Sequence, residues 1–233
     1  MDESRLIFFT GAPGSKWSAV SEVLTHTKLL EFDISDRNED RVYSHGEKFN
    51  SVQHLGTYFG PGMEFGENWD KLHTIPKNEI LLEIEQAFEL DTGGYRIIKC
   101  HQFVNNLDYI AETFPTSKII IVHRPVPSCM KGWFGSGGFD ITYPNYAPYY
   151  KNDDIAEYYI RLECEQAQEW IAKKGLKSYN VNQEHWEKYW GINAGEPQSY
   201  LDNYIKSIEG YLYHFNNKPS YDTFISYYGF DNV

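Results

Sequence analysis

Basic residues, cysteines and long apolar runs are all scarce in this 233-residue chain, and each scarcity excludes a class of protein. The formal net charge of −12 disfavours binding to nucleic acid or to anionic membranes, because such proteins usually present a basic face. The three cysteines, Cys100, Cys129 and Cys164, show no C-x-x-C spacing, which argues against a disulfide framework and against a zinc site. A reducing, cytoplasmic environment is therefore the expectation.

The apolar runs are too short for a signal peptide or a membrane span. Leu6–Phe9 is preceded by acidic residues where a secretory signal needs cations, and it is too short for the apolar core of such a signal. The best internal run, Ile119–Val122, is far below the roughly 20 residues that a membrane-spanning helix needs. We therefore expect a soluble protein with a single domain over residues 1–233, since this length supports one full core.

Apolar strand patterns alternate with amphipathic helix patterns along most of the chain. Strands are predicted for residues 5–9, 95–101, 118–123 and 176–181, and those at 95–101 and 118–123 are predicted to be buried. Helices are predicted for residues 18–26, 78–90, 105–114, 153–174 and 199–215, and a helical turn is predicted to start at Pro125. The strand–helix–strand order predicts an α/β three-layer sandwich with a mostly parallel sheet and helices on both faces.

The segment "TGAPGSKWSAV", Thr10–Val20, directly follows the first strand and has the composition of an anion-binding loop. It misses the Walker pattern G-x-x-x-x-G-K-[ST] by one residue, because Lys16 stands where the second glycine is required. It keeps a turn rich in glycine, then Lys16 and Ser18, then an amphipathic helix. Backbone N–H groups and a helix N-terminus are therefore expected to converge on an anion.

Two further strand ends carry titratable side chains. Lys99 and His101 close the second long strand, and Arg124 directly follows the third. Because ligands of open parallel sheets bind outside the carboxyl ends of the strands, these groups are expected to meet the loop at one edge. Strand alternation predicts that Lys99 and His101 point to the same side.

Three motifs give this chain a resemblance to a known family. "YRIIKCHQF" resembles the R-[IV]-[IV]-K-T-H strand of PAPS-dependent sulfotransferases, and "ETFPTSKIIIVHRPVPSC" resembles their P-x-[AS]-K-[IV]-I-x-[IV]-x-R-[ND]-P segment. "GAPGSKWS" is similar to the family's P-K-S-G-T-[ST] loop, and the motifs together cover about half of the chain. The aromatic loop after them is similar to those of small sulfotransferase-like proteins of marine bacteria and phages. The resemblance implies a P-loop-type fold and transfer of a sulfuryl group from 3′-phosphoadenosine 5′-phosphosulfate (PAPS) to a hydroxyl or amine, with PAP as product.

The resemblance also implies catalytic roles. His101 takes the position of the family's catalytic base. Lys99 and Lys16 are expected to stabilise the charge that develops during transfer. A sulfuryl transfer needs positioning, charge stabilisation and a base, so no metal is expected at the site.

The cofactor contacts follow from the same motifs. Arg124 takes the position of the arginine that binds the cofactor's 3′-phosphate, and Trp17 is expected to cover the adenine. The family's serine eight residues after that arginine is Gly132 here, so Ser128 or Ser136 is expected to take its role. The family's C-terminal K-G-x-x-G motif is missing. The loop expected to bind the 5′-phosphosulfate consists of Gly14, Ser15, Lys16, Trp17 and Ser18.

Two segments lack a steady hydrophobic period, an irregular insertion at about 27–76 and an aromatic loop at about 135–152. Because connections at the carboxyl ends of strands carry specificity, both are expected to form walls for the acceptor. The acceptor is expected to be a small molecule, and the acidic charge of the chain disfavours a highly anionic glycan.

Two other functions are compatible with these residues. A P-loop kinase acting on a nucleotide or small molecule would need a carboxylate at a strand end to hold Mg²⁺, and Asp33 is the candidate. A nucleotide-binding module without transfer activity is the other alternative. Metal dependence distinguishes a kinase from a sulfotransferase, and turnover distinguishes either enzyme from a binding module.

Overall fold

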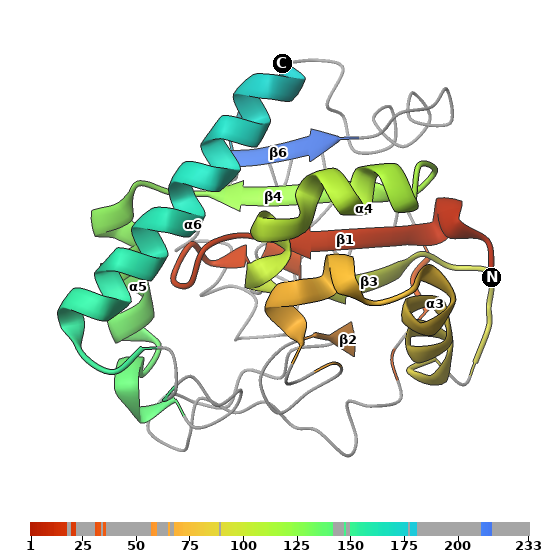
Figure 1. Ribbon diagram of the computed structural model, residues 1–233, viewed down its shortest axis with the longest axis horizontal. Coiled ribbons are helices and arrows are strands. Elements are labelled where there is room, and N and C mark those ends of the chain that lie inside the picture. The colour runs from red at the N-terminus through yellow and green to blue at the C-terminus, as the bar shows by residue number, and fades with distance from the viewer. Residues whose placement is uncertain are drawn as a thin grey trace, which may run out of the picture.

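The computed structural model has an α/β fold built on one sheet, as the alternating pattern predicts (Figure 1). It describes residues 1–17, 20–21, 31–33, 35, 57–59, 65, 68–88, 90–141, 147, 150–176, 178–180 and 211–215. Within these residues the sheet has six strands in the order β2-β3-β1-β4-β6-β5. None of the helices described in these ranges is long and apolar enough to cross a membrane.

The centre of the sheet is parallel. β1 (Leu6–Thr10) pairs with β3 (Arg96–Lys99) on one side and with β4 (Lys118–His123) on the other. These strands are buried on both faces, which explains their continuous apolar runs. The edge strand β2 (Thr57–Tyr58) pairs parallel with β3, so the segment predicted as an irregular insertion contributes a strand to the sheet.

The other edge of the sheet is antiparallel. β6 (Tyr211–Phe215) pairs with β4, and β5 (Ser178–Asn180), which was predicted as the fourth strand, pairs with β6. The helix predicted for residues 199–215 is therefore wrong over its last turn, and residues 199–210 lie outside the described part. The run Tyr-Leu-Tyr-His-Phe is rich in aromatic residues that favour strands, and its partner β4 is distant in the sequence.

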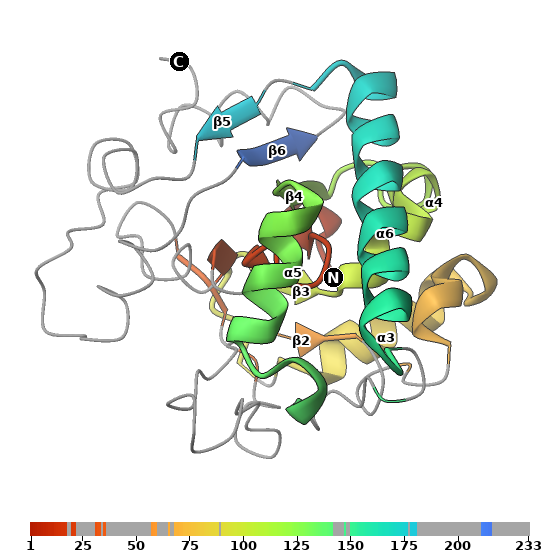
Figure 2. The ribbon, with the colours of Figure 1, turned by 90° about the vertical axis from the view of Figure 1, so that its left-hand side faces the viewer.

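Three helices cover one face of the sheet: α3 (Lys77–Gln86), α4 (Leu107–Thr113) and α6 (Asp153–Lys174) (Figure 2). Their apolar side chains form one core with alternate residues of the central strands. The members of this core include Leu6, Phe8, Ile80, Ile84, Ile98, Ile110, Ile119, Ile121, Trp170 and Ile171. Within the helix predicted for residues 18–26, only Val20 and Ser21 are described, so the second helical layer stays a prediction.

The sequence predicts the bounds of α6 to the residue. The Asn152 side chain accepts a hydrogen bond from the backbone N–H of Ile155 at 3.0 Å and caps the first turn. Gly175 ends the helix in the left-handed conformation with φ 63°. The helical turn predicted at Pro125 extends to a full helix, α5 (Val126–Gly135), which packs against α6.

An ion-pair cluster around Asp33 holds the amino-terminal edge of the sheet. The buried carboxylate accepts from Arg5 Nη2 at 2.6 Å and from Arg96 Nε at 2.8 Å. Burial raises the pKa of Asp33, but hydrogen bonds from Thr92, Arg96 and Gly94 together lower it below its usual value. Arg96 belongs to the first register pair of β1 and β3, and Arg5 directly precedes β1, so both lie at the edge opposite the loop after β1. Asp33, the carboxylate predicted to hold Mg²⁺ in a kinase, is thus paired with two arginines at the amino edge. This pairing disfavours a metal-binding role, and the kinase alternative stays a prediction.

Candidate functional site

The loop after β1 packs tightly onto α5 through two glycines. Gly14 has a φ of +75°, and a Cβ built on it would overlap the carbonyl oxygen of Cys129. A Cβ on Gly132 would in turn overlap the carbonyl oxygen of Gly14. A serine at position 132 would therefore clash with the loop, which gives Gly132 a steric reason.

Two cations lie together at this loop. Arg124 Nη1 approaches the carbonyl oxygen of Gly14 at 3.4 Å, and Lys16 has a left-handed backbone with φ 71°. Burial, and secondly the neighbouring charge of Arg124, lower the pKa of Lys16. Like charges repel, so an anion bound between Lys16 and Arg124 would relieve the repulsion and raise that pKa again.

Ser15 adds a buried hydroxyl to the same loop. Its side chain is 1% exposed, and its Oγ has no hydrogen-bond partner among the described residues. Its backbone N–H is already used, because it donates to Ala12 O at 2.9 Å and closes a turn. A buried hydroxyl without a partner is costly, so the loop has hydrogen-bonding capacity that a bound anion would satisfy.

The other residues predicted to contact the cofactor differ in how well they are placed to do so. Trp17 is buried and stacks on Tyr58 with ring centroids 5.6 Å apart, so β2 already covers one face of the indole. Ser18 lies outside the described residues. Ser128 is in the first turn of α5, near Arg124, whereas Ser136 lies about 12 Å further along at 1.5 Å per residue. Ser136 also donates its hydroxyl to Gly132 O at 2.9 Å, which leaves Ser128 as the better placed of the two.

His101 lies at the start of a 3₁₀ turn, η4 (His101–Asn106), and is fully buried. Its Nδ1 is 2.9 Å from Oε2 of Glu163, a buried carboxylate on α6. Tyr150 donates its hydroxyl to the other oxygen of Glu163 at 3.3 Å. With Nδ1–H donated to a carboxylate, Nε2 is the ring nitrogen that carries the lone pair, which is the arrangement of a general base.

Glu163 is the site residue that sequence reasoning missed. It is 62 residues from His101, and no motif or spacing connects the two. The sequence did contain one indication of its role. Glu163 lies on the same helical face as the apolar residues Ile160 and Ala167, and an acidic side chain buried on such a face needs a partner.

Lys99 is fully buried at the carboxyl end of β3. It is the last residue of β3 and lies beside Phe9, while Phe8 and Ile98 point to the opposite face and pack in the core with α6. The strand ends at Lys99, and His101 already belongs to a 3₁₀ turn. Strand alternation therefore no longer governs the direction of His101, and a joint position of the two side chains stays a prediction.

The three strand ends do meet at one edge of the sheet, since Phe9 pairs with Lys99 and Thr10 with Ile121. The Thr10 hydroxyl donates to the carbonyl of His101 at 3.0 Å and fixes the start of η4 against β1. Trp133 connects the loop with His101. Its backbone nitrogen lies close to Gly14, its ring is 5.6 Å from that of Tyr150, and the Tyr150 ring is 6.3 Å from that of His101.

Comparison with known proteins gives no family for this chain. No protein-family model matches it, and neither curated proteins nor solved structures gave a match. The chemistry of the site therefore has to be inferred from its own geometry: two cations and a buried hydroxyl at a glycine loop, beside a histidine that a carboxylate orients.

Proposed function

We propose that the chain is a PAPS-dependent sulfotransferase. The observation that carries the proposal is the loop after β1, where Lys16 and Arg124 lie together and the buried Ser15 hydroxyl has no partner among the described residues. Such a set of donors suits a phosphate or phosphosulfate group. PAPS has a phosphosulfate and a separate phosphate, which the loop and Arg124 would hold respectively.

The chain's own residues supply the rest of the chemistry. Bound PAPS would provide the sulfuryl group. Nε2 of His101 takes the proton of the acceptor hydroxyl or amine, and Glu163 stabilises the imidazolium that results. Lys16 stabilises negative charge at the group being transferred.

The geometry disfavours a kinase but is compatible with a nucleotide-binding module. A kinase loses its acidic candidate, because Arg5 and Arg96 bind Asp33 at the opposite edge. A non-catalytic nucleotide-binding module remains the second candidate, and the complete burial of His101 favours it. An acceptor can reach His101 only after neighbouring side chains move.

PAP should stabilise the protein against heat. At 100 times its Kd, PAP is expected to add about 2.7 kcal/mol to the free energy of unfolding and to raise Tm by roughly 5–10 °C. The shift should persist in EDTA, and differential scanning fluorimetry measures it. A shift with ATP and Mg²⁺ but none with PAP would contradict the proposal. A separate assay, in which the protein is incubated with labelled PAPS and a panel of acceptors, distinguishes a transferase from a binding module.

Arg124→Lys should weaken PAP binding about tenfold and leave the fold intact, because lysine lacks the planar fork that binds a phosphate through two hydrogen bonds. Isothermal titration calorimetry measures the affinity. Arg161→Lys is the matched control, since Arg161 is exposed on α6 and pairs with Glu157. Equal affinity in Arg124→Lys and the wild type would place the phosphate elsewhere.

A further inference from the structure

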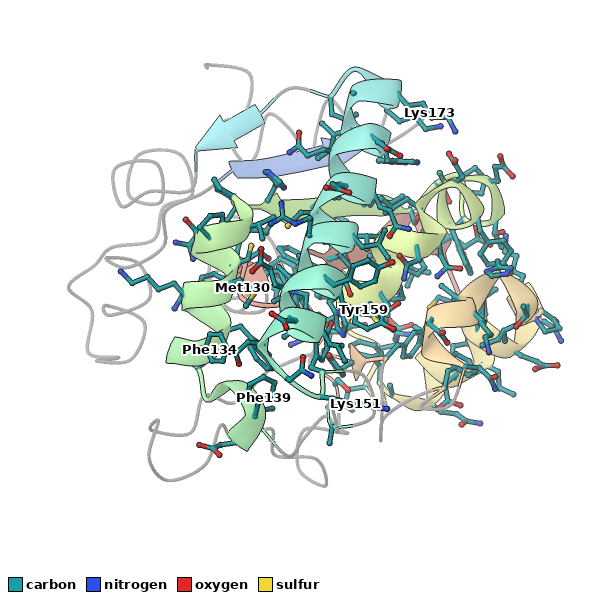
Figure 3. All side chains as sticks on the ribbon, turned by 60° about the vertical axis from the view of Figure 1, so that its left-hand side comes forward. Met130, Phe134, Phe139, Lys151, Tyr159 and Lys173 are labelled. Carbon is teal, nitrogen blue, oxygen red and sulfur yellow. The ribbon has the colours of Figure 1, made fainter. Side chains whose placement is uncertain are left out.

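A cavity of about 320 Å³ lies between the end of α5, the short turn η5 (Gly138–Asp140) and the segment that leads into α6. It is lined by Trp133, Gly138, Phe139, Ile141, Tyr150 and Lys151. Figure 3 shows Phe139 at the lower end of α5, near Phe134, and Lys151 before the first turn of α6. The volume lies at the lower end of the range for small-molecule sites, which suits a molecule with one aromatic ring.

The walls of this cavity are aromatic rings. Trp133 meets Phe139 edge to face at 4.8 Å and meets Tyr150 at 5.6 Å. Trp133 and Tyr150 are buried, whereas Phe139 is 45% exposed and lies at the entrance. Aromatic walls with one exposed ring favour a flat apolar ligand, because such rings pack in edge-to-face and offset arrangements.

A buried N–H donor without a partner in the described part of the chain indicates that the ligand carries an acceptor oxygen. The indole of Trp133 is 2% exposed, and its Nε1 has no hydrogen-bond partner within the described ranges. The indole of Trp170 differs, since its Nε1 donates to Asp108 at 3.0 Å. Buried tryptophan N–H groups usually have a partner, so the cavity favours a ligand with an acceptor oxygen. Lys151, exposed at the mouth, favours a negatively charged one.

Tyr150 connects the cavity with the proposed base. Its ring forms part of the cavity wall and lies 6.3 Å from the ring of His101, and its hydroxyl donates to Glu163 at 3.3 Å. A ligand in the cavity is therefore separated from His101 by one side chain.

We infer that this cavity binds a small aromatic carboxylate, with a carboxylate oxygen accepting from Trp133 Nε1 and its charge near Lys151. A hydroxyl on the same ring makes this ligand the acceptor of sulfuryl transfer, a step that rests on the proposed function. Because Tyr150 separates the ligand from His101, its side chain must move aside before this step. The hydroxyl oxygen then bonds to sulfur, the sulfur–oxygen bond to the phosphate of PAPS breaks, PAP leaves, and the hydroxyl proton goes to His101.

The test uses 4-hydroxybenzoate as the probe and calorimetric titration of the full chain without PAPS. The wild type should bind it, and Trp133→Phe should weaken binding about tenfold, because phenylalanine keeps a ring but has no N–H. Trp170→Phe is the matched control and should leave the affinity unchanged. Cyclohexanol, which has neither ring nor carboxylate, should bind more weakly than the probe.

Two variants at exposed residues keep the inference testable if Trp133→Phe fails to fold. Phe139→Ala and Lys151→Met change exposed residues, and each should weaken the probe several-fold, with the Lys151 effect smaller at high salt. Absence of binding at millimolar probe, or wild-type affinity in all three cavity variants, would overturn the inference. Binding that depends on Trp133 without any sulfation in the presence of PAPS would support the cavity ligand and contradict the proposed function.

Discussion

His101→Ala should lower turnover about 10²–10⁴-fold while PAP affinity stays nearly unchanged, because a positioned general base contributes to the transfer step and not to binding of the bisphosphate. The measurement is steady-state transfer from labelled PAPS to an acceptor found in a panel of hydroxylated small molecules. Wild-type turnover in His101→Ala would show that the base assignment is wrong.

Glu163→Gln should reproduce part of that loss. Glutamine accepts from Nδ1–H but lacks the charge that stabilises the imidazolium, so turnover falls through His101. The double variant should then lose little more than His101→Ala alone, since both changes act on one unit. Glu157→Gln, an exposed acid on the same helix, is the control and should keep wild-type turnover. Fully additive losses would contradict a positioning role for Glu163.

Asp33→Asn should lower the free energy of unfolding by about 3–5 kcal/mol, because it leaves buried arginine charge without its partner. Arg96 is 3% exposed and Arg5 is partly buried, and both donate to this one carboxylate. Urea unfolding followed by circular dichroism measures the loss. Asp91→Asn is the matched control, since Asp91 pairs with the same arginines but is 60% exposed, and its effect on the free energy of unfolding should be much smaller than that of Asp33→Asn.

The contribution of Asp33 to the free energy of unfolding should decrease as the pH falls. The folded pKa of Asp33 is lowered from 3.8, so its contribution to stability is present above that value and is lost as the pH falls through the lower, folded pKa. The difference between wild type and Asp33→Asn should therefore shrink below about pH 4. Wild-type stability of Asp33→Asn together with loss of Mg²⁺-dependent nucleotide binding would restore the kinase alternative.

Local patterns were sufficient for the elements that lie near the site. The apolar runs at Leu6–Phe9 and Lys118–Val122 identify buried parallel strands, because both faces of such strands are covered. The length and caps of α6 follow from Asn152, Gly175 and the helical period between them. The order of these elements and the groups at their ends also placed the glycine loop, His101 and Arg124 at one edge of the sheet.

The tertiary structure decided the contacts between residues that lie far apart in the sequence. Tyr211–Phe215 is a strand because β4 lies beside it, although its own pattern permitted a helix. Asp33 is a structural ion-pair partner, and Glu163 is the partner of His101, because folding buries each next to a charge or donor from a distant segment. The sequence by itself determined the α/β class and the edge at which the loop, His101 and Arg124 lie, since hydrophobic period and strand order are properties of the chain read in order. Only the tertiary structure decided which carboxylate pairs with which cation or imidazole, because burial and through-space distance set the energy of those contacts.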